Sequence, residues 1–242
     1  MKKIFSAFAA LIFVAALSSG SAAFASAHDE KSADKNVRVE APLNLAVLIQ
    51  DDLVSRVGNE LGVTGDFIRS LPQGSRVMVG YITSGSLQVR QPFTDDLGKA
   101  AKALRIPISS ATASPYNPYV EVIEALRRFD KTGKNRNALL LISDGLDTSH
   151  GFNYADAANS LDLQRAISEA KKRDVAVYSF YAPSVGLTSR NSTATLLGQS
   201  ALNRISDETG GRAFFQGTSF VSFEPYFEGL RRALNEQYAK AY

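Results

Sequence analysis

Apolar runs of strand length recur along the chain and alternate with longer segments in which apolar residues return every three or four positions. A run that is apolar throughout is typical of a strand covered on both faces of a sheet. The strands predicted in this way are Leu43–Ile49, Arg76–Thr83, Ala138–Ile142, Val175–Tyr181 and the shorter Arg212–Phe215. Ser86–Gln91 alternates apolar and polar residues, which indicates an edge strand or a hairpin partner of Arg76–Thr83.

Amphipathic patterns typical of helices fill the segments between these strands. The predicted helices are a stripe from Leu53 to Leu71, weakened by glycines, and Asp95–Leu104, Tyr119–Phe129, Leu161–Arg173, Gln199–Thr209 and Phe223–Tyr238. Thr94 and Ser160 are expected to cap two of them. Ala182–Gly198, rich in serine, threonine, glycine and asparagine, is expected to be irregular. Strands alternating with helices predict an α/β fold, a doubly wound, mostly parallel sheet with helices on both faces.

Aromatic residues are dense in the last part of the chain, from the final predicted strand onward. They are Phe214, Phe215, Phe220, Phe223, Tyr226, Phe227, Tyr238 and Tyr242. Aromatic side chains at helical spacing usually face inward. We therefore expect this set to pack in the core between the last strand and the last helix.

The first 27 residues have the pattern of a secretory signal peptide. Lys2 and Lys3 form a positive region, Ile4–Leu17 an apolar region, and Ala25-Ser26-Ala27 a small-residue cleavage site. The apolar stretch is short for a membrane span, so we predict cleavage and export to the periplasm or the medium, with no span afterwards. The predicted organisation is a signal peptide at 1–27, a flexible segment at 28–40 and a single domain at 41–242.

Charge and cysteine content exclude several classes of function. The chain has 27 lysine and arginine residues against 24 acidic ones. Removing Lys2 and Lys3 leaves 25 against 24, so the charge does not favour a nucleic-acid partner. The absence of cysteine excludes disulfides, thiolate nucleophiles and cysteine-ligated zinc.

Acidic clusters follow two of the predicted strands. Gln50-Asp51-Asp52 comes after Leu43–Ile49, and Ser143-Asp144-Gly145 comes after Ala138–Ile142. In doubly wound sheets, ligands bind in the crevice outside the carboxyl ends of the strands. Oxygen ligands meeting there suit a hard cation such as Mg²⁺. A polar loop, Ser109–Ser114, is a third candidate contributor.

The order of these segments resembles the von Willebrand factor type A (VWA) domain in its bacterial secreted branch. The resemblance runs from about Leu43 to Tyr242 and is carried by LPQGSRVMVGYITSG, QPFTDD, ALLLISDGLDTS, VAVYSF and ISDETGGRAFF. It implies a doubly wound sheet and a metal-ion-dependent adhesion site. In that site Asp-x-Ser-x-Ser, a threonine loop and an aspartate share one Mg²⁺, whose open position takes a partner's carboxylate.

The family's ligand pattern is altered in this chain. With Ile49 as the last strand residue, the first aspartate position falls on Gln50, the first serine on Asp52 and the second serine on Val54. The ligands implied by the resemblance are Gln50, Asp52, Ser114 and Asp144, with Mg²⁺ or another divalent cation as the expected cofactor. Thr112 is the alternative loop ligand. A register shifted by one residue offers Asp51 and Ser55 instead, but it would bury Gln50 within the strand.

Two further interpretations of the same residues remain open. Asp51 or Asp52 could cap the following helix, and Asp144 could start a turn with Gly145, with no ion involved. The function predicted first is an exported protein-interaction module, and not an enzyme. The alternative is a metal-free structural or assembly protein that binds through helix faces or through Ala182–Gly198. A hydrolase using His150 is the most remote possibility, because no Gly-x-Ser-x-Gly elbow follows a strand.

Overall fold

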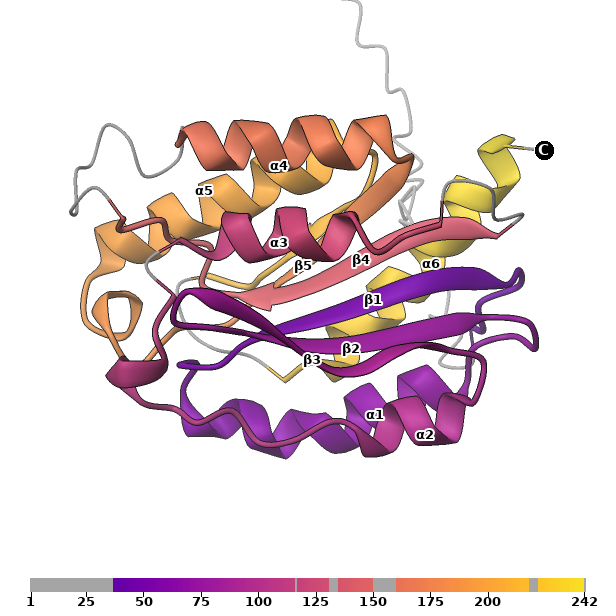
Figure 1. Cartoon of the computed structure of the whole chain (residues 1–242), viewed down its shortest axis with the longest axis horizontal. Coiled ribbons are helices and arrows are strands. Elements are labelled where there is room, and N and C mark those ends of the chain that lie inside the picture. Colours follow the sequence, from indigo (N-terminus) through magenta and orange to yellow (C-terminus); the bar gives the residue numbers. More distant parts are fainter. Residues whose placement is uncertain (1–36, 116, 131–134, 150–159, 218–221, 242) are drawn as a thin grey trace, which may run out of the picture. The chain divides into compact units, whose positions relative to one another are not determined.

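A six-stranded sheet forms the centre of the computed structural model (Figure 1). The model describes residues 37–115, 117–130, 135–149, 160–217 and 222–241. The strands are β1 (Leu43–Gln50), β2 (Arg76–Thr83), β3 (Ser86–Thr94), β4 (Arg136–Ser143), β5 (Val175–Tyr181) and β6 (Ala213–Phe214). Their order across the sheet is β3-β2-β1-β4-β5-β6. The predicted signal peptide, most of the predicted flexible segment and His150 lie outside the described residues.

The pairing confirms the predicted doubly wound sheet. β1 lies between β2 and β4 and is parallel to both, and β5 and β6 continue the parallel pairing. Only β3, at the edge, is antiparallel to its neighbour β2, as the hairpin prediction requires. All residues of β1 and β5 are buried, which explains why their sequences are mainly apolar.

Helices cover both faces of the sheet. They are α1 (Leu61–Arg69), α2 (Leu97–Lys102), α3 (Pro118–Leu126), α4 (Leu161–Lys172), α5 (Ser192–Glu208) and α6 (Glu224–Ala241), with short 3-10 helices η1 (Ser55–Glu60), η2 (Ala111–Ala113) and η3 (Leu187–Ser189). The apolar side chains of α1, α2 and α6 pack in one cluster and those of α3, α4 and α5 in another. The sheet separates these two layers (Figure 1). Among the described residues, none of the helices is both long and apolar enough to cross a membrane.

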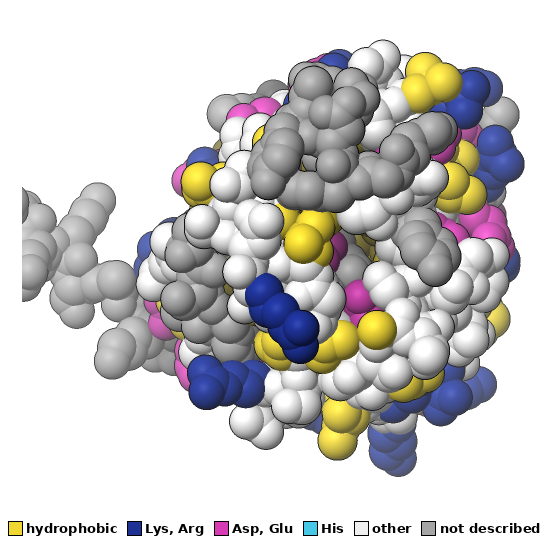
Figure 2. Space-filling view, turned by 90° about the vertical axis from the view of Figure 1, so that its left-hand side faces the viewer, with side chains coloured by type: hydrophobic (Ala, Val, Ile, Leu, Met, Phe, Trp, Pro, Cys, Tyr) yellow, Lys and Arg dark blue, Asp and Glu magenta, His cyan; other side chains and the backbone are white. Residues whose placement is uncertain are grey.

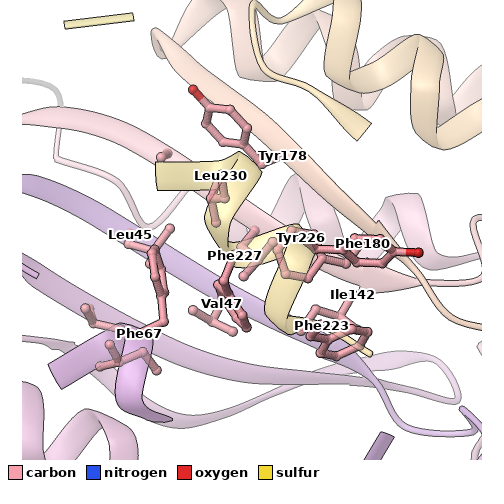
Figure 3. Packing of buried hydrophobic residues seen from close by; sticks show 14 of the residues in the cluster. Leu45, Val47, Phe67, Ile142, Tyr178, Phe180, Phe223, Tyr226, Phe227 and Leu230 are labelled. Atoms are coloured by element: carbon pink, nitrogen blue, oxygen red, sulfur yellow. The ribbon is translucent and has the colours of Figure 1, made fainter. Parts of the chain in front are cut away.

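The predicted aromatic core lies between β5 and α6 (Figure 3). The Phe180 ring is 4.9 Å from the Phe227 ring and 5.5 Å from the Phe223 ring, measured between centroids. Tyr226 completes the group at 5.3 Å from Phe180. Phe215, by contrast, is 36% exposed. The prediction is therefore confirmed for the α6 aromatics and wrong for the residue that follows β6. Phe220 and Tyr242, and the side chain of Tyr238, lie outside the description.

The prediction of an irregular segment from Ala182 to Gly198 is wrong in its second half. Helix α5 begins at Ser192, not at Gln199. The Asn191 side chain accepts a hydrogen bond from the Ala194 amide at 3.1 Å and so caps the helix. Thr195 donates its hydroxyl to the Thr188 carbonyl at 2.8 Å. These local bonds let serine and threonine residues begin a helix in a stretch whose composition indicates a loop.

Two further boundaries differ from the sequence prediction. Thr94 is the last residue of β3, and Asp96 caps α2 by accepting from the Lys99 amide at 2.8 Å. The predicted stripe from Leu53 to Leu71 is divided into η1 and α1. Glycines in this stretch weaken a continuous helix, in agreement with that division.

Candidate functional site

The carboxyl ends of β1 and β4 meet where the chain order of the sheet reverses, since β2 lies on one side of β1 and β4 on the other. β1 ends at Gln50, not at Ile49 as predicted, so the burial of Gln50 within the strand, which was the argument against the shifted register, is observed. Gln50 joins the two strands through its amide. Its Oε1 accepts from the Ser143 hydroxyl at 2.5 Å and from the Asp144 amide at 3.3 Å. Its Nε2 donates to Asp52 Oδ1 at 2.7 Å. Gln50 therefore links both acidic clusters that the sequence placed at this edge.

Asp52 and Asp144 are buried close to each other, at 1% and 4% exposure. Burial, and then the negative charge of Asp144, raise the pKa of Asp52 to about 6, although Gln50 and Ser114 partly offset the rise. Burial also raises the pKa of Asp144, against hydrogen bonds that favour its charged form. Asp52 Oδ2 has no hydrogen-bond partner in the described part of the chain. The pair is thus an electrostatically costly arrangement.

The loop after β5 closes the site from a third side. Thr188 donates its hydroxyl to Asp144 Oδ2 at 3.0 Å and accepts from the Ser184 amide at 2.9 Å. The same loop is tied to the segment after β1, because the Val185 amide donates to the Asp52 carbonyl at 2.8 Å. The sequence analysis missed Thr188 and Ser184 as members of the site. The one available signal was the long polar segment that follows Val175–Tyr181.

A cavity of about 110 Å³ opens among these groups. Its lining residues are Gln50, Ser114, Pro115, Asp144, Leu146, Thr148, Ser184, Gly186 and Leu187. Figure 2 faces this edge of the sheet and shows acidic side chains recessed near the middle of the surface. No lysine, arginine or histidine is among these described lining residues, so the Asp144 carboxylate gives the cavity a negative potential.

Asp51, which precedes Asp52 in the sequence, makes its hydrogen bonds outside the Asp52–Asp144 cluster. It pairs with Arg105 through two hydrogen bonds of 2.6 and 2.7 Å and accepts from the Ile108 amide at 2.9 Å. Ser55 is exposed at the start of η1. The structure therefore does not bring the residues of the shifted register, Asp51 and Ser55, to the Asp52–Asp144 cluster.

The two loop candidates, Ser114 and Thr112, differ in whether they reach the cavity. Ser114 lines the cavity. Thr112 lies in η2, is exposed, and hydrogen-bonds through its hydroxyl to Ser110 at 2.9 Å. Of the four favoured candidates, Gln50, Asp52 and Asp144 are hydrogen-bonded or electrostatically coupled to one another, and Ser114 borders the same cavity.

The two ion-free interpretations have different outcomes. The helix after β1 begins at Ser55, and its N-cap residue, Val54, makes no side-chain cap. The hypothesis that Asp51 or Asp52 caps this helix is therefore wrong. Asp144 does start a turn with Gly145, because its Oδ1 accepts from the Leu146 amide at 3.1 Å and Gly145 has a φ of 72°.

The oxygen atoms around the site do not fit an octahedral Mg²⁺ site. Asp52 Oδ1 is bonded to the Gln50 amide, and the Asp144 oxygens are bonded to the Leu146 amide and the Thr188 hydroxyl. Of the four carboxylate oxygens, only Asp52 Oδ2 accepts no hydrogen bond from the described residues. Mg²⁺ demands near-ideal octahedral oxygen coordination. In the part of the chain that the structure describes, no three histidine, cysteine or acidic residues are grouped to hold a metal.

Stability is expected to depend on the protonation of Asp52. Its folded pKa, about 6, lies above the ordinary value of 3.8. The stabilisation by the bound proton is thus complete below about pH 4 and lost as the pH rises through 6, an effect of about 3 kcal/mol. Asp52→Asn should raise the unfolding midpoint at pH 7.5 by about 5–10 °C and flatten the profile between pH 4 and 6. Parallel pH profiles for the two proteins, measured by thermal unfolding, would contradict this assignment.

Comparisons with known proteins identify the fold. No protein-family model matches the chain, and comparison with curated protein sequences finds no match. Among solved structures, an aerotolerance-related membrane protein from Bacteroides fragilis matches with a TM-score of 0.53 and 12% identity, covering 80% of this chain and 99% of that one. BatB, a conserved hypothetical protein from Bacteroides thetaiotaomicron, matches with a TM-score of 0.54 and 12% identity, over 83% and 100% of the two chains.

A third match is the VWA domain of SpRpn10, with 13% identity over 81% of this chain and 95% of that domain. Its TM-score of 0.47 is too low to add to the assignment. The strand order with its antiparallel edge, together with the first two structures, confirms the VWA-type fold that the sequence resemblance predicts. At such low identity the likeness extends to the fold alone.

Proposed function

We propose that this chain is a non-catalytic protein-interaction module that binds its partner at the carboxyl edge of the sheet without a bound divalent cation. One observation carries the proposal: Asp144, which is electrostatically coupled to the buried Asp52, lines a cavity at the point where the strand order reverses. Doubly wound sheets bind ligands in this crevice. The Gln50 amide links the acidic clusters through hydrogen bonds and so holds the edge together.

Catalysis is not part of the proposal because the described part of the cluster holds no histidine base beside a nucleophile. The Ser143 hydroxyl donates to the Gln50 amide oxygen, which cannot act as a base, and the Thr188 hydroxyl, which donates to Asp144, is only 4% exposed. Acyl transfer needs a nucleophile within reach of a base. We also propose that the protein acts after export, on the basis of the signal-peptide pattern in residues 1–27.

A cation-holding form of the same module is the second candidate, with Asp52, Asp144 and Ser114 as ligands. The observation in its favour is the unpartnered Asp52 Oδ2 beside a second carboxylate. It is the weaker candidate because the neighbouring oxygens already accept hydrogen bonds and Gln50 directs an amide donor at Asp52. Any cation would need water for most of its coordination.

Photo-crosslinking tests the proposed surface. A benzophenone side chain introduced at Ser189, exposed beside Thr188, should form adducts with a partner protein in the cells that produce this chain. The matched control is the same side chain at Gln73, exposed before β2 at the opposite edge of the sheet. We expect adducts at Ser189 in EDTA and in Mg²⁺. Adducts at Gln73 alone would overturn the proposal, and adducts at Ser189 that EDTA abolishes would favour the cation-holding form.

A further inference from the structure

Two large apolar side chains are exposed on the segment Arg105–Ser110, which leads toward the carboxylate site. Ile106 is 64% exposed and Ile108 56% exposed. We call this pair the isoleucine ridge. Exposed apolar groups that lie together, with polar groups around them, are typical of interaction surfaces.

The ridge is held in place by the carboxylate next to the site. Arg105 bonds to Asp51 through both terminal nitrogens, and its guanidinium lies 4.0 Å from the centre of the Tyr81 ring. The Ile108 amide donates to Asp51 Oδ1, and the Ser109 amide donates to the Asp51 carbonyl, each at 2.9 Å. The backbone is therefore anchored directly behind the two exposed isoleucines.

The backbone at the end of the ridge is also strained. Ser109 has a φ of 54°, which serine rarely adopts. Such conformations persist where surrounding contacts impose them, and they cluster at ligand-binding segments. A loop anchored in a strained conformation, with its apolar side chains outward, is organised before a partner arrives. Such preorganisation reduces the entropy cost of binding.

The ridge and the negative cavity are connected through the chain in two ways. Asp51 anchors the ridge, and the next residue, Asp52, belongs to the carboxylate pair. On the other side, the chain continues from the ridge through η2 to Ser114, which lines the cavity. The segment that carries the ridge therefore leads to a cavity lined by Asp144 and by no basic side chain among the described residues.

We infer that the ridge and the cavity together form a surface that binds a partner segment in which a lysine is flanked by branched apolar residues. The lysine ammonium enters the cavity toward Asp144 and Asp52, and the apolar side chains pack on Ile106 and Ile108. This inference rests on the proposed function and names the partner's chemistry. An ammonium is a compact charge with three donors on a slender stem. It suits a cavity of about 110 Å³ that is lined by Asp144 and by no basic side chain among the described residues.

Selection of peptides tests the inference. Random nine-residue peptides are selected for binding to the immobilised full-length chain in EDTA. We expect enrichment of a lysine beside isoleucine, valine or leucine. Replacing that lysine with norleucine should weaken binding at least tenfold. The variants Asp144→Asn and Ile106→Ser/Ile108→Ser, checked for folding by their unfolding midpoints, should each weaken it at least tenfold.

Leu161→Ser is the matched control, because Leu161 is 60% exposed on a different surface, the groove between α3 and α4. It should leave the affinity unchanged. Enriched acidic peptides, loss of binding only in Leu161→Ser, or no enrichment would each overturn the inference. Crosslinks from Ser189 in the same protein would still uphold the proposed function, so the two failures are distinguishable.

Discussion

Replacing Asp51 with alanine should lower the free energy of unfolding by about 4 kcal/mol, because removing one partner of a buried ion pair typically costs about 3–5 kcal/mol. The Asp51 side chain is fully buried and that of Arg105 is 24% exposed. The change removes both bonds to Arg105 and leaves the Ile108 amide without its acceptor. Urea unfolding of the variant and the unmodified protein measures the difference.

Asp66→Ala provides the control for the Asp51 prediction. Asp66 forms an ion pair with Arg69 at 2.8 Å, but its side chain is 79% exposed. Exposed pairs typically contribute less than about 1 kcal/mol. A loss for Asp51→Ala no larger than that for Asp66→Ala would mean that Asp51 does not anchor the loop that carries the isoleucine ridge.

Replacing Gly198 with alanine should destabilise the protein strongly. Overpacking typically costs about 1–3 kcal/mol, and the loss of stability here should be larger. A β-carbon at Gly198 would lie 2.0 Å from the Asp144 carbonyl oxygen, closer than any real contact. The obstacle is backbone, so no side-chain rotation relieves it. Either α5 or the Asp144–Gly145 turn must move, and the turn carries a site carboxylate. We expect a large fall in the unfolding midpoint and loss of the pH dependence assigned to Asp52.

Gly62→Ala is the matched control within α1. A β-carbon there meets nothing within 4 Å, and alanine is favoured over glycine in a helix by about 1 kcal/mol. This variant should be neutral or more stable. Equal destabilisation of both variants in thermal unfolding would show that close packing of α5 on the site turn is not the cause.

The fold was predictable because a strand that is buried on both faces of the sheet has a mainly apolar sequence. β1 and β5 are mainly apolar and correspond closely to the predicted Leu43–Ile49 and Val175–Tyr181. The prediction from polar and apolar composition was wrong where local hydrogen bonds determine where a helix begins. The Asn191 cap begins α5 inside a stretch that reads as a loop, and Asp96 caps α2 where Thr94 was expected.

The candidate site was only partly predictable. Gln50, Asp52 and Asp144 could be placed together because the carboxyl ends of adjacent parallel strands share one edge. Thr188 reaches Asp144 from a loop 44 residues away in the sequence, and no local pattern encodes that contact. Nor does the sequence reveal that Arg105 binds Asp51. Because of this ion pair, Asp51 has a structural role, and the adjacent Asp52 belongs to the site.

Cation dependence of stability tests the central claim, that the carboxylate cluster is a binding site maintained without a divalent ion. The measurement is thermal unfolding of the full-length chain in EDTA and then in millimolar Mg²⁺, Ca²⁺ or Mn²⁺, alongside Asp144→Ala. An ion that binds only the folded state raises the midpoint by mass action. The account predicts no ion-specific shift in either protein. A midpoint that rises with one of these ions, and does not rise in Asp144→Ala, would contradict it.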